Sequence, residues 1–142
     1  MDPGNILFHR NFQFADGGSA DKYLVVIGAA ATHIVVAKTT SNGSRYRNDH
    51  GCRAGSYFAA FMLTRGCCCL PLNTWVCLGD FYELTIAELH AKLFAGQMRR
   101  YGILDPDLAR DLQTCAAGCD DISSSQADGA YAPKEQGQAG TE

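Results

Sequence analysis

The spacing of apolar residues divides the chain of 142 residues into two parts. From residue 4 to residue 83, short apolar runs rich in β-branched and aromatic side chains alternate with Gly, Asn and Asp, and helical periodicity is weak. Such runs are typical of short strands joined by turns. The predicted strands are 5–14, 22–28, 32–39, 56–63 and 74–81. The pattern therefore predicts a mainly β protein with a small antiparallel barrel or sandwich.

The second part of the pattern, residues 85–119, has helical spacing. Thr85 and Glu88 have the spacing of a capping box at a helix start. Behind them, Ile86, Leu89 and Leu93 fall on one helix face.

Two further signals divide this region into two helices. Arg99 and Arg100 suit the last turn of the first helix, which we expect to end at Gly102. Asp105-Pro106 then opens a second helix, with proline at its first position, and Gly118 ends it. Its apolar stripe consists of Leu108, Leu112 and Cys115. These signals predict a C-terminal α-helical hairpin.

Composition refines this organisation. A hydrophobic content of 46% suffices for one core, so residues 1–119 are expected to form one domain. Residues 120–142 are rich in Ser, Gly, Ala, Gln and acidic residues, and we expect a disordered tail. The net charge is −3, of which the tail contributes −4 and residues 1–119 contribute +1. Residues 38–65 hold five basic residues against one aspartate, which suits either an anionic ligand or a solvated loop.

Targeting signals and cysteine usage indicate a cytoplasmic protein without a membrane segment. The N-terminus lacks the basic segment followed by an apolar segment that is typical of a secretory signal. The longest apolar run, 23–31, is too short to cross a bilayer. The seven cysteines are odd in number and three are consecutive, at 67–69. Adjacent residues on a strand point to opposite faces, so we expect mostly reduced thiols packed as small apolar side chains.

A zinc site is the alternative interpretation of the cysteines. His50, Cys52, the run 67–69, Cys115 and Cys119 could supply ligands, but none has the paired C-x2-C spacing of a strong zinc site. We therefore expect no metal and no cofactor.

The stretch 34–47, IVVAKTTSNGSRYR, carries the candidate chemistry. Lys22 begins one predicted strand, and the hydroxyls of Thr39, Thr40 and Ser41 end the next. Sequential strands usually pair antiparallel, which would place these residues at the same end of the sheet. A cation beside hydroxyls suits cleavage of RNA by attack of its 2′-hydroxyl, because developing charge and protons must be handled. The alternative is a strand end with turn-capping hydroxyls.

The order of segments resembles the PemK/MazF-like toxin ribonuclease family. The resemblance rests on GNILFHRNFQF at 4–14, the basic residue before YLVVIG, KTTSN at 38–42, and LPLNTWVCLGDFYELTIAEL at 70–89. It implies an SH3-like barrel with appended helices, and a metal-independent endoribonuclease that acts on single-stranded RNA. It also implies a homodimer and an inhibitory antitoxin protein. The catalytic cation would be Lys22, where the family usually has arginine, and its hydroxyl partner Thr39 or Thr40.

The residues after the predicted strand are candidates for gripping the RNA backbone and stacking a base. They are Ser41, Arg45, Tyr46, Arg47 and His50, with Trp75 a weaker candidate. His50 could also act as a general acid or base. The alternative function is a non-catalytic SH3-like module that binds a protein or nucleic-acid partner.

Overall fold

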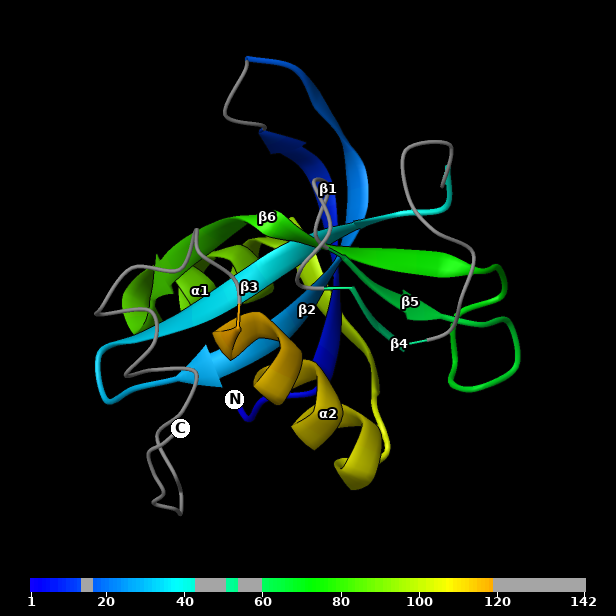
Figure 1. The fold of residues 1–142 in the computed structure, drawn as a ribbon. Helices are drawn as coiled ribbons and strands as arrows, with labels where there is room; N and C mark the ends of the chain where they lie inside the picture. The colour runs from blue at the N-terminus through cyan, green and yellow to red at the C-terminus, as the bar shows by residue number, and fades with distance from the viewer. Residues whose placement is uncertain (14–16, 43–50, 54–59, 119–142) are drawn as a thin grey trace.

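The computed structural model describes residues 1–13, 17–42, 51–53 and 60–118, the side chains of Arg53 and Asp80 excepted. Its strands are β1 (Asn5–Gln13), β2 (Ser19–Ala29), β3 (His33–Thr40), β4 (Gly51–Arg53), β5 (Ala60–Leu63), β6 (Thr74–Thr85) and β7 (Met98–Ile103). Its helices are α1 (Ile86–Ala95) and α2 (Pro106–Ala117). The described part is thus mainly β, as the apolar pattern predicted (Figure 1).

The strands form one antiparallel sheet in the order β4-β5-β6-β3-β2-β1-β7. Within the described residues β4 and β7 are its two edges, so the sheet is open. Five of the strands correspond to the five predicted runs. The short β4 and the edge strand β7 were not predicted.

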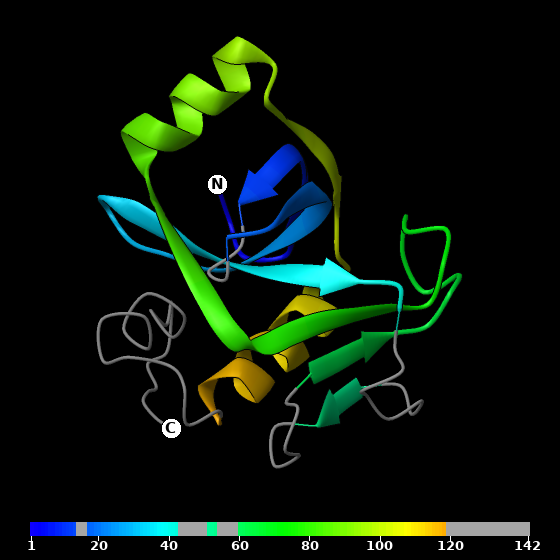
Figure 2. The same ribbon diagram turned by 90° about the horizontal axis from the view of Figure 1, so that it is seen from above.

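The helices lie on opposite sides of this sheet (Figure 2). Strand residues alternate between the two sides, so Leu24 and Val26 belong to one apolar cluster and Val25 to the other. The cluster that includes Leu89 of α1 defines the α1 face of the sheet. The cluster that includes Leu112 of α2 defines the α2 face.

The predicted helical hairpin is wrong. The capping box at Thr85 and Glu88 is present, but α1 ends at Ala95, where Gly96 adopts a left-handed conformation with φ 77°. The backbone N–H of Gln97 donates to the carbonyl of Lys92, which closes the helix end. Glycine is a poor residue for a helix interior and a good one for this cap.

Arg99 and Arg100 therefore lie on a strand, not in a last helical turn. They belong to β7, which pairs with β1 from Asn5 opposite Ile103 to His9 opposite Met98. This pairing satisfies the backbone groups of an otherwise open β1 edge, and a longer helix could not do so. The second helix begins at Pro106 and is capped at Gly118, as predicted.

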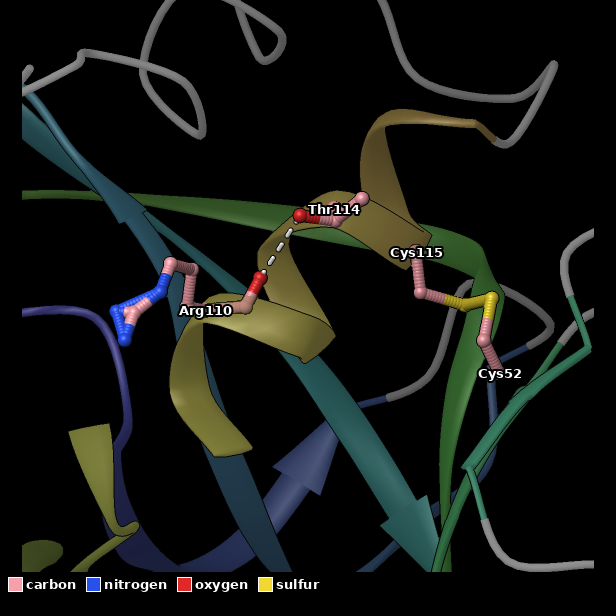
Figure 3. Close-up of a disulfide and its surroundings, with 4 residues drawn as sticks. All are labelled: Cys52, Arg110, Thr114 and Cys115. Atoms are coloured by element: carbon pink, nitrogen blue, oxygen red, sulfur yellow. Dashed lines mark hydrogen bonds between the residues drawn. A yellow bond between two sulfur atoms is a disulfide. The ribbon is translucent and has the colours of Figure 1, made fainter. Parts of the chain in front are cut away.

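One disulfide joins α2 to the sheet. Cys52 on β4 is bonded to Cys115 on α2, across a sequence separation of 63 residues (Figure 3). The expectation of mostly reduced thiols is wrong for these two cysteines, and the disulfide removes both from the zinc interpretation. Alternation along a strand constrains only neighbouring cysteines, whereas tertiary packing brings this pair together.

Four of the described cysteines are not disulfide-bonded: Cys67, Cys68, Cys69 and Cys77. The run 67–69 lies in turns and bends, not on a strand. The sulfur of Cys69 lies against Gly102 of β7, where a side chain would collide with it. No helix in the described residues is long and apolar enough to cross a membrane. The predicted tail, 120–142, lies outside the described residues.

Candidate functional site

A cavity of about 170 Å³ lies where β3 separates from β2. The last pair in the β2–β3 ladder is Leu24 with Lys38, and the cavity lies just beyond it. The lining residues are Asp21, Lys22, Tyr23, Thr39, Thr40, Ser41, Leu70, Pro71, Leu72 and Thr74. Lys22 and the three hydroxyl residues therefore lie at the same end of the sheet, as the strand-pairing argument predicted.

The two threonines differ in what their hydroxyls do. Thr39 is 3% exposed, and its Oγ1 donates to the backbone carbonyl of Tyr23 at 2.8 Å. Its hydroxyl is thus used to hold β3 against β2. Thr40 is only half-buried, and its Oγ1 accepts a hydrogen bond from the backbone N–H of Asn42 at 3.1 Å.

Strand register favours Thr40 as the partner of Lys22. Extending the pairing of Leu24 with Lys38 by two residues puts Lys22 opposite Thr40. Directly opposite residues of a regular ladder share a face, and Thr39 lines the same cavity. Both threonines line the cavity and both hydroxyls bond to the backbone, Thr39 to Tyr23 and Thr40 to Asn42, while the extended register favours Thr40.

Lys22 lies in an environment that disfavours its charge. Burial is the largest influence and lowers the pKa of Lys22, while Cys77 raises this pKa and the positive charge of Lys38 lowers it. Two lysines near each other on one face repel unless an anion lies between them. The site is therefore suited to a negatively charged ligand, and Lys22 can exchange a proton more readily than an exposed lysine.

His9 is a buried neighbour of Lys22, outside the cavity lining, that sequence reasoning missed. It lies directly opposite Lys22 in the β1–β2 ladder and is 3% exposed. Its Nδ1 is 2.8 Å from the backbone carbonyl of Arg10, to which it must donate. Burial lowers the pKa of His9, the bond to Arg10 raises it, and the charge of Lys92 lowers it. Period-two alternation of 5–14 would have put His9 on one face with Leu7, but not beside Lys22.

Asp21 has a structural role at the rim of the cavity. Its Oδ1 accepts a hydrogen bond from the backbone N–H of Asn11 at 2.8 Å. Asn11 has a positive φ of 54° and lies at the irregularity between β1 and β2. Ser19 Oγ donates to the Asn11 side chain at 3.0 Å. These bonds fix the strand segment that carries Lys22.

The other sequence candidates have different outcomes. Ser41 is exposed and lines the cavity. Arg45, Tyr46, Arg47 and His50 lie outside the described residues. Trp75 is buried with Ala60 and Met62, so this weaker stacking candidate is a core residue. No cluster of three or more potential metal ligands occurs among the residues that the structure describes.

The sequence matches no protein-family model, and no curated protein matches it significantly. A function must therefore be argued from the chemistry of the site itself.

Proposed function

We propose that the protein is a metal-independent endoribonuclease of the toxin type, which cleaves single-stranded RNA by attack of a 2′-hydroxyl on the adjacent phosphate. In this proposal the sheet is a divergent, incompletely closed version of the SH3-like PemK/MazF-like barrel. The observation that carries the proposal is that the half-buried Lys22 and Thr40 line one cavity. A homodimer and an antitoxin partner belong to the same proposal.

The protein must assist three events in this reaction. The 2′-oxygen must lose a proton, the 5′-oxygen must gain one as it leaves, and the phosphorane oxygens carry extra charge in between. The Lys22 ammonium stabilises that charge, and because its pKa is lowered by burial it can also exchange a proton. Thr40, and the exposed Ser41, can donate their hydroxyl protons to phosphate oxygens.

Two features favour the alternative of a binding module without catalysis. The hydroxyl of Thr39 and the carboxylate of Asp21 are already used in structural hydrogen bonds. Lys22 also cannot form the bidentate hydrogen bonds with which arginine binds a phosphate. A protein that binds RNA at this cavity without cutting it would keep all the contacts described above.

The decisive experiment measures cleavage of a labelled single-stranded RNA by purified wild type and variants. We expect Lys22→Ala to lose at least about 100-fold in rate, because general acid–base groups contribute factors of this size. Thr40→Ala is expected to lose more than Thr39→Val. Lys92→Ala removes the same charge from α1 and serves as the control, with an expected change below about two-fold.

The pH profile tests whether Lys22 moves a proton. The positive charge of Lys38 lowers the pKa of Lys22, so Lys38→Ala should raise this pKa and shift the Lys22-dependent limb to higher pH. Lys22→Arg keeps the charge but does not titrate, and should remove that limb. Wild type that binds RNA but does not cleave it would reject the endoribonuclease in favour of the binding module.

A further inference from the structure

Four side chains form a continuous strip on the α2 face, across strands β2, β1 and β7. Tyr23 lies directly opposite Phe8, and Phe8 lies directly opposite Arg99. Tyr101 joins them through its ring contact with Tyr23. We call Tyr23, Phe8, Arg99 and Tyr101 the aromatic strip.

The contacts within the aromatic strip position a cation on top of the rings. The ring of Tyr23 makes edge-to-face contacts with Phe8, at a centroid distance of 5.2 Å, and with Tyr101, at 4.7 Å. The Arg99 guanidinium lies 5.1 Å from the centroid of Phe8 and 5.9 Å from that of Tyr101. The three rings are half-buried and Arg99 is exposed. Two aromatic contacts thus preorganise the guanidinium while leaving it open to solvent.

The aromatic strip meets the cavity at Tyr23, whereas Lys22, the preceding residue on β2, alternates to the α1 face. Tyr23 belongs to both, because it lines the cavity and contacts the rings of Phe8 and Tyr101. From there the strip runs across β1 to the edge strand β7. Arg99 forms no ion pair with any carboxylate in the described part of the chain, so its charge is not neutralised there.

We propose, resting on the proposed function for RNA as the ligand, that the aromatic strip binds the nucleotides that leave the cavity past Tyr23. Bases stack on the exposed ring and guanidinium surfaces, and Arg99 neutralises a backbone phosphate. Charge complementarity favours this occupant, because an exposed arginine on aromatic rings suits a polyanion with planar bases. Stacking of this kind tolerates any base. The aromatic strip therefore increases RNA affinity and sets the path of the bound RNA without a preference for its sequence.

The test is a binding titration with a fluorescent 2′-O-methyl oligonucleotide of about ten nucleotides, a length typical of such sites. Its blocked 2′-oxygens prevent cleavage, so binding is measured alone. Arg99 and Arg100 provide a matched pair on one strand: Arg99 lies opposite Phe8, whereas Arg100 lies opposite Leu7, which belongs to the α1 face. Each substitution by alanine removes one positive charge, but only Arg99→Ala removes it from the strip.

We expect Arg99→Ala and Tyr101→Ala each to weaken binding about ten-fold or more, and Arg100→Ala by less than about two-fold. Arg99→Ala should also lower the slope of log affinity against log salt concentration by the amount expected for about one phosphate contact. Tyr101→Phe, which keeps the ring, should restore binding. Circular dichroism of each variant controls for folding.

Equal losses of RNA affinity for Arg99→Ala and Arg100→Ala would overturn the proposal. Such losses would indicate general electrostatic attraction of the RNA, not binding along the aromatic strip. Absence of RNA binding by wild type would also overturn it. Cleavage assays on the same preparations separate the two proposals. If RNA binding depends on Arg99 but no cleavage occurs, the endoribonuclease proposal is rejected and the aromatic-strip proposal stands. If cleavage occurs but binding does not depend on Arg99, the aromatic-strip proposal is rejected and the endoribonuclease proposal stands.

Discussion

The two helices cover opposite faces of one sheet but are held there by different means. α1 has a complete capping box: the Thr85 hydroxyl accepts from the backbone of Glu88 at 3.1 Å, and the Glu88 carboxylate accepts from that of Thr85 at 2.9 Å. α2 has proline at its start, and its N-cap Asp105 makes no side-chain capping bond. Instead, α2 is covalently tied to β4 by Cys52–Cys115.

This difference suggests that the two faces respond to different conditions. The α1 face depends on local capping signals and apolar packing, which do not change with oxidation state. The α2 face depends partly on a disulfide, which a reducing compartment opposes. The α2 face also carries the aromatic strip. We therefore expect loss of order on this face to weaken the proposed binding of RNA.

The largest effect that we expect comes from reducing the disulfide. In the chain-entropy model, a cross-link over 63 residues contributes about 4 kcal/mol to stability. Urea unfolding with and without dithiothreitol should show a loss of this order. Cys52→Ser should be nearly insensitive to the reductant, and Cys67→Ser should respond like wild type. Equal stability of the oxidised and reduced wild type would mean that packing alone holds α2.

Packing on the α1 face is tested by Leu89→Ala. Leu89 is 2% exposed within the α1-face cluster, and truncation of such a residue costs about 3 kcal/mol. Phe94, on the same helix but 96% exposed, is the control, and Phe94→Ala should change the unfolding free energy by less than about 0.5 kcal/mol. Similar losses for both variants would show that Phe94 is covered in solution, for example by a second copy of the chain.

The smallest effect concerns the helix starts. Thr85→Ala removes a capping bond and should cost about 1 kcal/mol, measured by urea unfolding. Asp105→Ala removes no capping bond, so its cost should be clearly smaller. A larger loss from Asp105→Ala would contradict the difference that we draw between α1 and α2.

Local patterns were sufficient for most of the elements. β-branched runs identified five strands, and the Thr85 and Pro106 signals identified both helix starts, because caps and alternation act within a few residues. The end of α1 was missed because Arg99 and Arg100 suit a helix end as well as a strand. Gly96 was the local signal that could have corrected this.

The candidate site could be predicted only in part. Antiparallel pairing of neighbouring strands brought Lys22 and Thr40 to one cavity, because β2 and β3 are joined by a single hairpin. His9 and the aromatic strip needed the exact register of β1 against β2 and β7, including its irregularities. A slip of one residue would exchange the faces of Phe8 and Leu7, so composition alone cannot place them.

The sequence by itself determined that this chain is mainly β, where its helices begin, and that a lysine and several hydroxyls gather at one sheet end. Tertiary structure alone decided that β7 joins the sheet, that Cys52 meets Cys115, and that Arg99 rather than Arg100 lies on the rings. The physical reason is distance along the chain. Propensity and capping depend on neighbours in sequence, whereas these contacts depend on which distant segments compete to bury apolar surface and satisfy backbone groups.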